Sequence, residues 1–224
     1  MKKRFNKLSA LLILGLLLIG MSLACYVWMR KEQRQYALDR QLIAALMKND
    51  AMQALVLVEE GADPSTREVP SPAPSLPSLI NQLLHLSPPK ANTSSTAFLI
   101  ACGAGFGYSR SNDIPPVFQL SPLDPHLMQA MLLHGAKVNA KDPIMGTALG
   151  MTVINALVHP AEYNMNKEII KLLLAYGADP DEEDKPFMFG SISTPMQASL
   201  YTSSLHLPSH PDLVALLRKY SKHP

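Results

Sequence analysis

The stretch EIIKLLLAYGADP, residues 168–180, runs from aliphatic side chains to a glycine that is followed by turn residues. Gly177 can take the left-handed backbone conformation that ends a helix, because it has no Cβ to clash. Asp179 and Pro180, which come next, are typical of turns. This stretch therefore predicts a helix that stops at Gly177 and passes into a turn.

The same pattern recurs upstream. It reads LVLVEEGADP at 55–64 and MLLHGAKVNA at 131–140, with Gly61 and Gly135 in the place of Gly177. Self-similarity of this kind indicates an internal structural repeat. We therefore predict two more helices that end at a left-handed glycine.

A second pattern precedes these helices, in which an apolar run opens on a threonine. The three copies are TAFLIAC at 96–102, TALGM at 147–151 and TPMQASL at 194–200. A threonine hydroxyl at a helix start accepts a hydrogen bond from a backbone N–H of the first turn. We predict that Thr96, Thr147 and Thr194 cap helices, with Pro195 at a first helical position.

Together these motifs resemble the ankyrin repeat, in which a Thr-Pro-Leu-like opening starts one helix and an aliphatic second helix ends in Gly-Ala-Asp and a turn. The resemblance covers roughly residues 40–222, and its last copy, at 212–224, has Ser221 in the glycine position, as expected of a terminal cap. It implies an all-α fold, an ankyrin-like helix-pair solenoid with irregular inserted loops. About four stacked units would share one core.

Helix pairs are expected near 41–48 with 51–60, 96–103 with 124–134, 147–157 with 165–176, and 195–204 with 210–220. The glycine positions are spaced more widely than the roughly 33 residues of a regular repeat. We assign the excess to inserts near 64–95 and 103–123, and to shorter ones at 158–165 and 181–193. The segment SLINQLLHL at 78–86 is either a short helix in the first insert or the first helix of a degenerate extra repeat.

Residues 8–29 carry no charge and predict a transmembrane helix, because about 1.5 Å per residue gives roughly 33 Å, enough for the hydrocarbon core. Tyr26 and Trp28 lie near its far end, where such rings favour the membrane interface. A basic cytoplasmic tail at 1–7 precedes this signal-anchor, and a juxtamembrane helix or linker at 30–40 joins it to a repeat domain at 41–222.

Two other fates remain open for this segment. Ser22 and Ala24 before Cys25 resemble a signal-peptide cleavage site. Leu23-Ala24-Cys25 partly resembles a lipoprotein signal, although Ser22 stands where the leucine is usual. The basic residues before the helix are dense and free of acids, so the positive-inside rule favours an extracytoplasmic, in a bacterium periplasmic, domain.

The charge distribution argues against nucleic-acid binding. The formal net charge is +2, but four of the 20 basic residues lie in the tail, and the rest are outnumbered by 18 acidic ones. A nucleic-acid binder needs a basic face on its folded part. We expect a protein partner of unknown identity and a lipid bilayer bound through 8–29, with neither nucleic acid nor a small-molecule substrate.

Two patterns partly resemble ligand sites. The G-x-G-x-G string at 103–107 has no strand before it and no Gly-Lys-Ser/Thr after it, so a helix end and turn is favoured over a phosphate loop. His206 and His210 have the four-residue spacing of helical metal ligands. Pro208 between them disfavours one continuous helix, so we expect no metal here.

The acidic run at 179–184 predicts a solvated hairpin tip. Cys102 with His126 or His134 would be a nucleophile pair, but apolar neighbours raise a thiol pKa, which favours a buried structural cysteine. Cys25 lies in the hydrophobic segment, so no disulfide framework is expected. We therefore predict no catalytic residues, no metal and no cofactor.

The function implied is a membrane-anchored ankyrin-repeat module that binds or inhibits a partner protein at the cell envelope, and not an enzyme. Ankyrin-family proteins usually bind with the hairpin tips and the concave face of the first helices, and long loops tend to be functional. The expected contacts are Asp63, Lys137, Asn139 and Asp181 at the tips, and Arg110, Asn112, Asp113 and Phe118 in the second insert. The alternative is a metal-binding or enzymatic protein that uses the inserts as a site.

Overall fold

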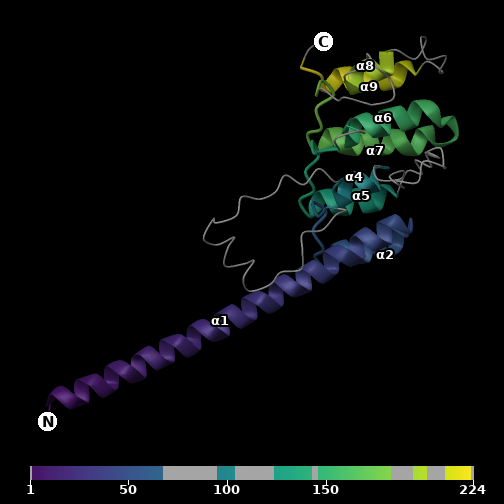
Figure 1. Cartoon of the computed structure of the whole chain (residues 1–224). Coiled ribbons are helices and arrows are strands. Elements are labelled where there is room, and N and C mark those ends of the chain that lie inside the picture. The colour runs from purple at the N-terminus through teal and green to yellow at the C-terminus, as the bar shows by residue number, and fades with distance from the viewer. Residues whose placement is uncertain are drawn as a thin grey trace, which may run out of the picture. The chain divides into compact units, whose positions relative to one another are not determined.

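The computed structural model describes residues 2–67, 95–103, 124–142, 146–182, 194–200 and 210–222, most of which are helical (Figure 1). The chain divides into two compact units. One contains residues 1–37, and the other contains the described residues from Leu38 onward. The predicted segment at 78–86 and the body of the insert at 103–123 lie outside the described residues.

The N-terminal helix α1 runs without a break from Lys2 to Met47. This differs from the expected boundary near residue 41, since the first helix of the first pair is the end of α1. The reason lies in residues 30–47, which are almost entirely strong helix formers such as Arg, Gln, Ala and Leu. The helix ends at Met47, and Asn49 in the turn that follows has a φ of +57°.

Part of α1 is long and apolar enough to cross a membrane. Over Leu12–Met47 it contains an 18-residue window of mean hydropathy 2.2, and none of that window is buried. Leu16 and Met21, for example, leave 68% and 66% of their surface exposed. In a protein surrounded by water, such apolar side chains would be packed against the rest of the fold. Their exposure here agrees with the apolar segment predicted at 8–29.

The second unit consists of short helices in pairs. Its elements after α1 are α2 (Ala51–Glu59), α4 (Ala97–Ala101), α5 (Pro125–Leu133), β1 (Lys141–Asp142), β2 (Gly146–Thr147), α6 (Ala148–Val158), a 3₁₀ turn η1 (Pro160–Glu162), α7 (Tyr163–Ala175), α8 (Pro195–Leu200) and α9 (Pro211–Tyr220). Within pairs, α4 packs on α5, α6 on α7 and α8 on α9. Between pairs, α2 contacts α5, α5 contacts α7 and α7 contacts α9, so the second helices form one continuous row.

The predicted threonine caps are confirmed. The hydroxyl of Thr147 accepts the Gly150 N–H at 3.1 Å, and that of Thr194 accepts the Gln197 N–H at 3.1 Å. Thr96 accepts the Leu99 N–H at 3.3 Å in the same way. Each bond satisfies a backbone donor that the first helical turn leaves unpaired. Helix α8 begins at Pro195, as expected.

The predicted helix ends are confirmed at the glycines, whose φ angles are +100° at Gly61, +89° at Gly135 and +88° at Gly177. Ser221, at the last copy, has an extended backbone instead, with φ −69° and ψ 141°. The short insert expected at 158–165 is largely structured, because η1 and the first residues of α7 occupy it. The two-residue strands β1 and β2 pair antiparallel and were not predicted.

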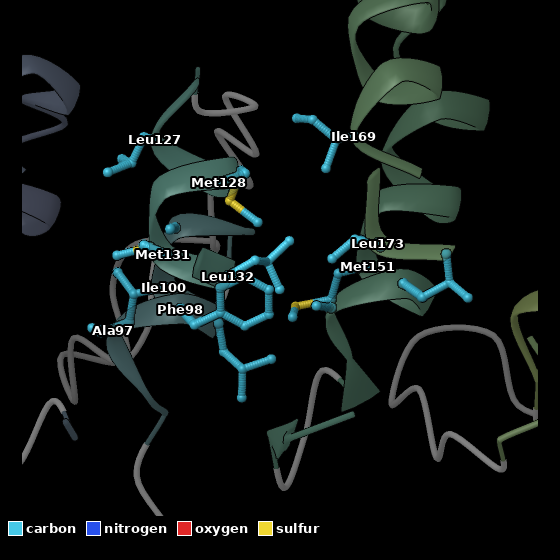
Figure 2. Packing of buried hydrophobic residues seen from close by; sticks show 14 of the residues in the cluster. Ala97, Phe98, Ile100, Leu127, Met128, Met131, Leu132, Met151, Ile169 and Leu173 are labelled. Carbon is cyan, nitrogen blue, oxygen red and sulfur yellow. The ribbon is translucent and has the colours of Figure 1, made fainter. Parts of the chain in front are cut away.

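A single hydrophobic cluster runs through the described helix pairs. Figure 2 shows its centre, where Phe98 of α4 and Met128 of α5 point toward Met151, Ile169 and Leu173 of the next pair. All five are at most 3% exposed. Because burying one such side chain contributes about 1.5–3 kcal/mol, the interface between pairs is a main source of stability. No pair could bury these faces alone.

Candidate interaction surface at the turns

The turns that follow α2, α5 and α7 have the same backbone geometry. In each, the N–H of the alanine after the glycine donates to a carbonyl five residues earlier: Ala62 to Leu57 at 2.9 Å, Ala136 to Met131 at 3.0 Å and Ala178 to Leu173 at 2.9 Å. This bond is the mark of a helix end closed by a left-handed glycine. Three separate sequence copies therefore build one repeated local structure.

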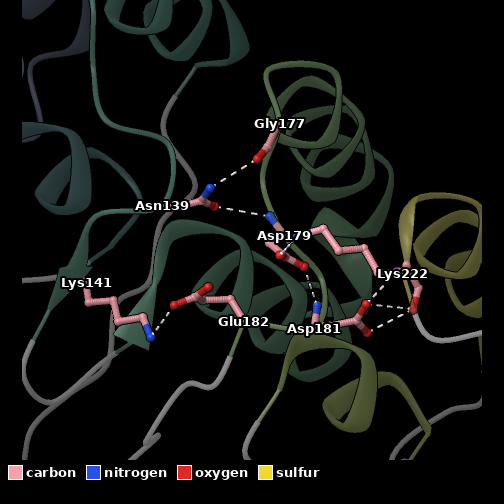
Figure 3. A network of polar contacts seen from close by, with 8 residues as sticks. Asn139, Lys141, Gly177, Asp179, Asp181, Glu182 and Lys222 are labelled. Atoms are coloured by element: carbon pink, nitrogen blue, oxygen red, sulfur yellow. Dashed lines mark hydrogen bonds and ion pairs between the residues drawn. The ribbon is translucent and has the colours of Figure 1, made fainter.

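One side chain bridges the second and third turns. The Asn139 amide nitrogen donates to the Gly177 carbonyl at 3.1 Å, and its amide oxygen accepts the Asp179 N–H at 3.1 Å (Figure 3). Asn139 thereby satisfies two backbone groups that the end of α7 leaves available. Asp39 of α1 accepts the equivalent N–H of Asp63 at 2.8 Å, so the first turn is held in a related way.

The third turn is tied to the end of α9 by carboxylates. Asp181 accepts the Ser221 hydroxyl at 2.8 Å and the Lys222 N–H at 2.7 Å, and the Lys222 ammonium pairs with Asp179 at 2.6 Å (Figure 3). The hydrogen bond that the Lys222 ammonium donates to Asp179 is the main reason that the pKa of Lys222 is raised. Glu182 pairs with Lys141 of β1 at 2.5 Å.

These contacts correct the prediction of a wholly solvated acidic tip at 179–184. Asp179 and Asp181 are structural acceptors, and the Asp179 side chain is only 18% exposed. The reason is that adjacent turns lie close enough for a carboxylate of one to reach backbone or lysine donors of the next. Residues 183 and 184 lie outside the described residues.

The predicted partner contacts divide into three groups. Asp63, Asn139 and Asp181 lie at the turns, but each is engaged in the bonds between turns described above. Lys137 is exposed at the second turn, and its side chain makes no hydrogen bond or ion pair with the described residues. The insert contacts lie outside the described residues: Arg110, Asn112, Asp113 and Phe118.

A second polar cluster lies at the N-terminal ends of α7 and α9, and no local sequence pattern predicts it. The Tyr163 hydroxyl donates to Asp212 at 2.8 Å, and Lys167 forms an ion pair with the same carboxylate. The His210 ring stacks on Tyr163, with centroids 4.0 Å apart. This cluster joins the third helix pair to the fourth.

The protonation states of this cluster indicate a structural role and not a role in proton transfer. The hydrogen bond from Lys167 is the largest cause that lowers the pKa of Asp212 to about 2. Burial, followed by the Asp212 carboxylate, raises the pKa of Tyr163. Near neutral pH the carboxylate therefore stays charged and the phenol stays protonated, so neither is poised to exchange protons.

The other candidate residues of the sequence give no assembled site in the described part of the chain. Cys102 is partly buried, and burial raises the pKa of its thiol, as predicted. Gly103 has φ +100° just after α4, as a helix end requires. His206 lies outside the described residues, and among the described ones no group of three or more His, Cys, Asp or Glu is arranged to hold a metal.

Comparisons with known proteins identify no family for this chain. No protein-family model matches the chain, and no curated protein matches it. A functional assignment therefore has to come from the repeated turns, the packed helix pairs and the apolar helix. Of these, the turns are the feature that recurs most regularly.

Proposed function

We propose that this chain is a membrane-anchored repeat protein of the ankyrin type, whose turns and inserted loops dock a protein partner at the cell envelope. The observation that carries this proposal is the recurrence of one local structure. Three turns share a left-handed glycine and the same closing hydrogen bond, and those after α5 and α7 follow the second helix of a packed pair. Arrays of this kind present extended surfaces that suit recognition.

The bonds between turns support a binding role, because they fix the edge on which the tips lie. Asn139 joins the second turn to the third, and Asp181 joins the third to the end of α9. A surface that is held in register before binding loses less conformational entropy when a partner docks. In this proposal Asn139 and Asp181 position the edge, and exposed side chains such as Lys137 contact the partner.

The apolar part of α1 is proposed to remain as a signal-anchor, with residues 8–29 in the bilayer and the repeat domain outside the cytoplasm. The exposed apolar surface of residues 12–28 supports a lipid environment. Intact-mass measurement of the membrane fraction tests the fate of this segment. A mature chain that begins at or near Cys25, or one that carries lipid on Cys25, would contradict a retained anchor.

Site-specific photocrosslinking in native membranes tests the docking edge. A crosslinker in place of Lys137 should yield a discrete protein adduct. The same group in place of Lys171, an exposed residue of α7 away from the turns, should not. Deletion of residues 104–122 should abolish the adduct if the second insert contributes specificity. Identical adducts from both positions, or none from Lys137, would contradict the proposal.

A further inference from the structure

The stretch from Tyr26 to Arg34 lies where the uncharged part of α1 ends. Tyr26, Arg30 and Arg34 are spaced by four residues, so they lie along one face of the helix. Arg30 donates from Nε to the Tyr26 hydroxyl at 3.0 Å, and its guanidinium carbon lies 5.4 Å from the centre of the Tyr26 ring. The first basic side chain after the apolar segment is therefore directed back toward that segment.

With residues 8–29 in the bilayer, as proposed above, the guanidinium donors of Arg30 and Arg34 would lie at the level of lipid headgroups. Arg30 uses one of its five N–H donors on Tyr26, and the others are available for an oxyanion. The planar guanidinium can bind a phosphate through two parallel hydrogen bonds. A tyrosine at a membrane interface keeps its ring in the apolar layer and its hydroxyl in the polar one, so it sets the depth of Arg30.

The surrounding charges favour an anionic ligand. Arg34 lies about 40° around the helix from Arg30, and Lys31 lies about 100° around it. Glu32 is the one acidic residue between Tyr26 and Ala37, and at about 200° it faces the other side of the helix. The face that contains Tyr26 is thus uniformly positive outside the apolar segment.

We propose that Tyr26, Arg30 and Arg34 form a binding site for the phosphodiester of an anionic phospholipid. The proposal rests on the membrane anchor of the proposed function, but it adds a lipid preference that an apolar helix alone does not have. Basic residues next to a membrane surface attract anionic lipids, and this attraction weakens as salt is added. Zwitterionic lipids offer the same phosphate without a net charge, so they should occupy the site less.

The chain carries its own probe, because Trp28 is its only tryptophan. Trp28 lies about 160° around the helix from Arg30, whereas Val27 lies within about 20° of Arg34. The variant Val27→Trp with Trp28→Phe therefore moves the single tryptophan onto the proposed face. The full chain is reconstituted in phosphatidylcholine vesicles with an equal fraction of phosphatidylglycerol, and one of the two lipids carries brominated acyl chains that quench tryptophan.

Brominated phosphatidylglycerol should quench the tryptophan at position 27 more strongly than brominated phosphatidylcholine, with a local enrichment of about five-fold for one typical basic contact. The preference should be smaller at Trp28 and should decline with added salt. Arg30→Gln together with Arg34→Gln, in the position-27 background, should remove it while total quenching stays unchanged. Arg40→Gln, about 15 Å farther along α1, is the matched control and should retain it.

The outcomes separate this inference from the proposed function. Equal quenching by the two lipids at position 27, or an undiminished preference in the Arg30/Arg34 variant, would overturn the lipid site and leave the anchor intact. Quenching by neither lipid would contradict the anchor itself. Tyr26→Phe keeps the ring and removes the hydroxyl, so a preference reduced by this variant would support the depth-setting role of Tyr26.

Discussion

Gly177 has a φ of +88°, a conformation that side-chain-bearing residues rarely adopt. A Cβ built there meets no atom within 4 Å, so a substitution is penalised by backbone strain and not by a clash. We predict that Gly177→Val lowers the free energy of unfolding by about 1–3 kcal/mol, toward the upper end because valine is β-branched. Urea denaturation of the full chain in detergent measures this loss.

Ala175→Val is the matched control for that variant. It introduces the same side chain two residues earlier, at an exposed helical position, where only helix propensity is lost, about 0.5 kcal/mol. An unchanged midpoint for Gly177→Val would mean that the turn does not need its left-handed residue. The repeat assignment would then lose its best copy.

Asn139 should contribute to stability by bridging two turns, since both ends of its amide are bonded. We predict that Asn139→Ala costs about 1 kcal/mol, because the freed backbone groups are exposed enough to bond water. Lys137→Ala, in the same turn, should stay within about 0.5 kcal/mol of the parent. Equal effects of the two variants in thermal unfolding would argue against the bridge.

At the scale of elements, the contact between α7 and α9 should depend on pH through Asp212. Its pKa falls from 3.8 to about 2 on folding, so the ionised carboxylate contributes stability that is complete above pH 3.8 and is lost as the pH falls toward about 2. The side chain is 45% exposed, so solvent screening keeps the contribution below about 1 kcal/mol. Hydrogen exchange of α9 amides as a function of pH measures it.

Asp212→Asn keeps an acceptor for Tyr163 and removes the charge that Lys167 binds. In this variant α9 should exchange faster at neutral pH and should lose less protection on acidification than the parent. Glu168→Gln, which breaks an exposed ion pair within α7, should behave like the parent. An acid response of α9 that is identical in Asp212→Asn and the parent would assign the effect to other groups.

The sequence predicted the elements whose signals are local. A glycine before a turn and a threonine before an apolar run act within one helical turn, so Gly61, Gly135, Thr96 and Thr147 were predicted correctly. The separate helix expected to start near residue 41 was wrong, because residues 30–47 are mostly strong helix formers and α1 continues through them to Met47.

Contacts between helix pairs are not announced by any local sequence pattern. Tyr163 and Asp212 are 49 residues apart, and Asp181 and Lys222 are 41 apart. Which polar residues contact one another depends on how the helix pairs stack, and the sequence of a single pair does not determine this stacking. The same reason explains why the acidic tip was expected in solvent. The partner contacts proposed in the second insert stay predictions.

At the scale of the whole molecule, stacking and bridging act together. The helices of each pair bury apolar faces against the next pair, and the turns add polar bonds in the same direction along the row. Arrays of this type derive stability mainly from contacts between nearest neighbours. A perturbation in one pair should therefore be felt by the pairs beside it, and a partner that spans several turns would stabilise all of them.

The orientation of the anchor gives the last prediction. Lys2, Lys3, Arg4 and Lys7 precede the apolar segment without an acid, whereas the basic residues after it are interrupted by Glu32. The positive-inside rule then keeps the N-terminus in the cytoplasm.

A C-terminal reporter enzyme that is active only outside the cytoplasm should be active in the parent. It should lose much of that activity when the four N-terminal basic residues are replaced by glutamine, because the charge bias then reverses. Replacing Arg30, Lys31 and Arg34 is the opposite control and should leave the reporter active. A reporter that is inactive in the parent would place the repeat domain, and hence its partner, in the cytoplasm.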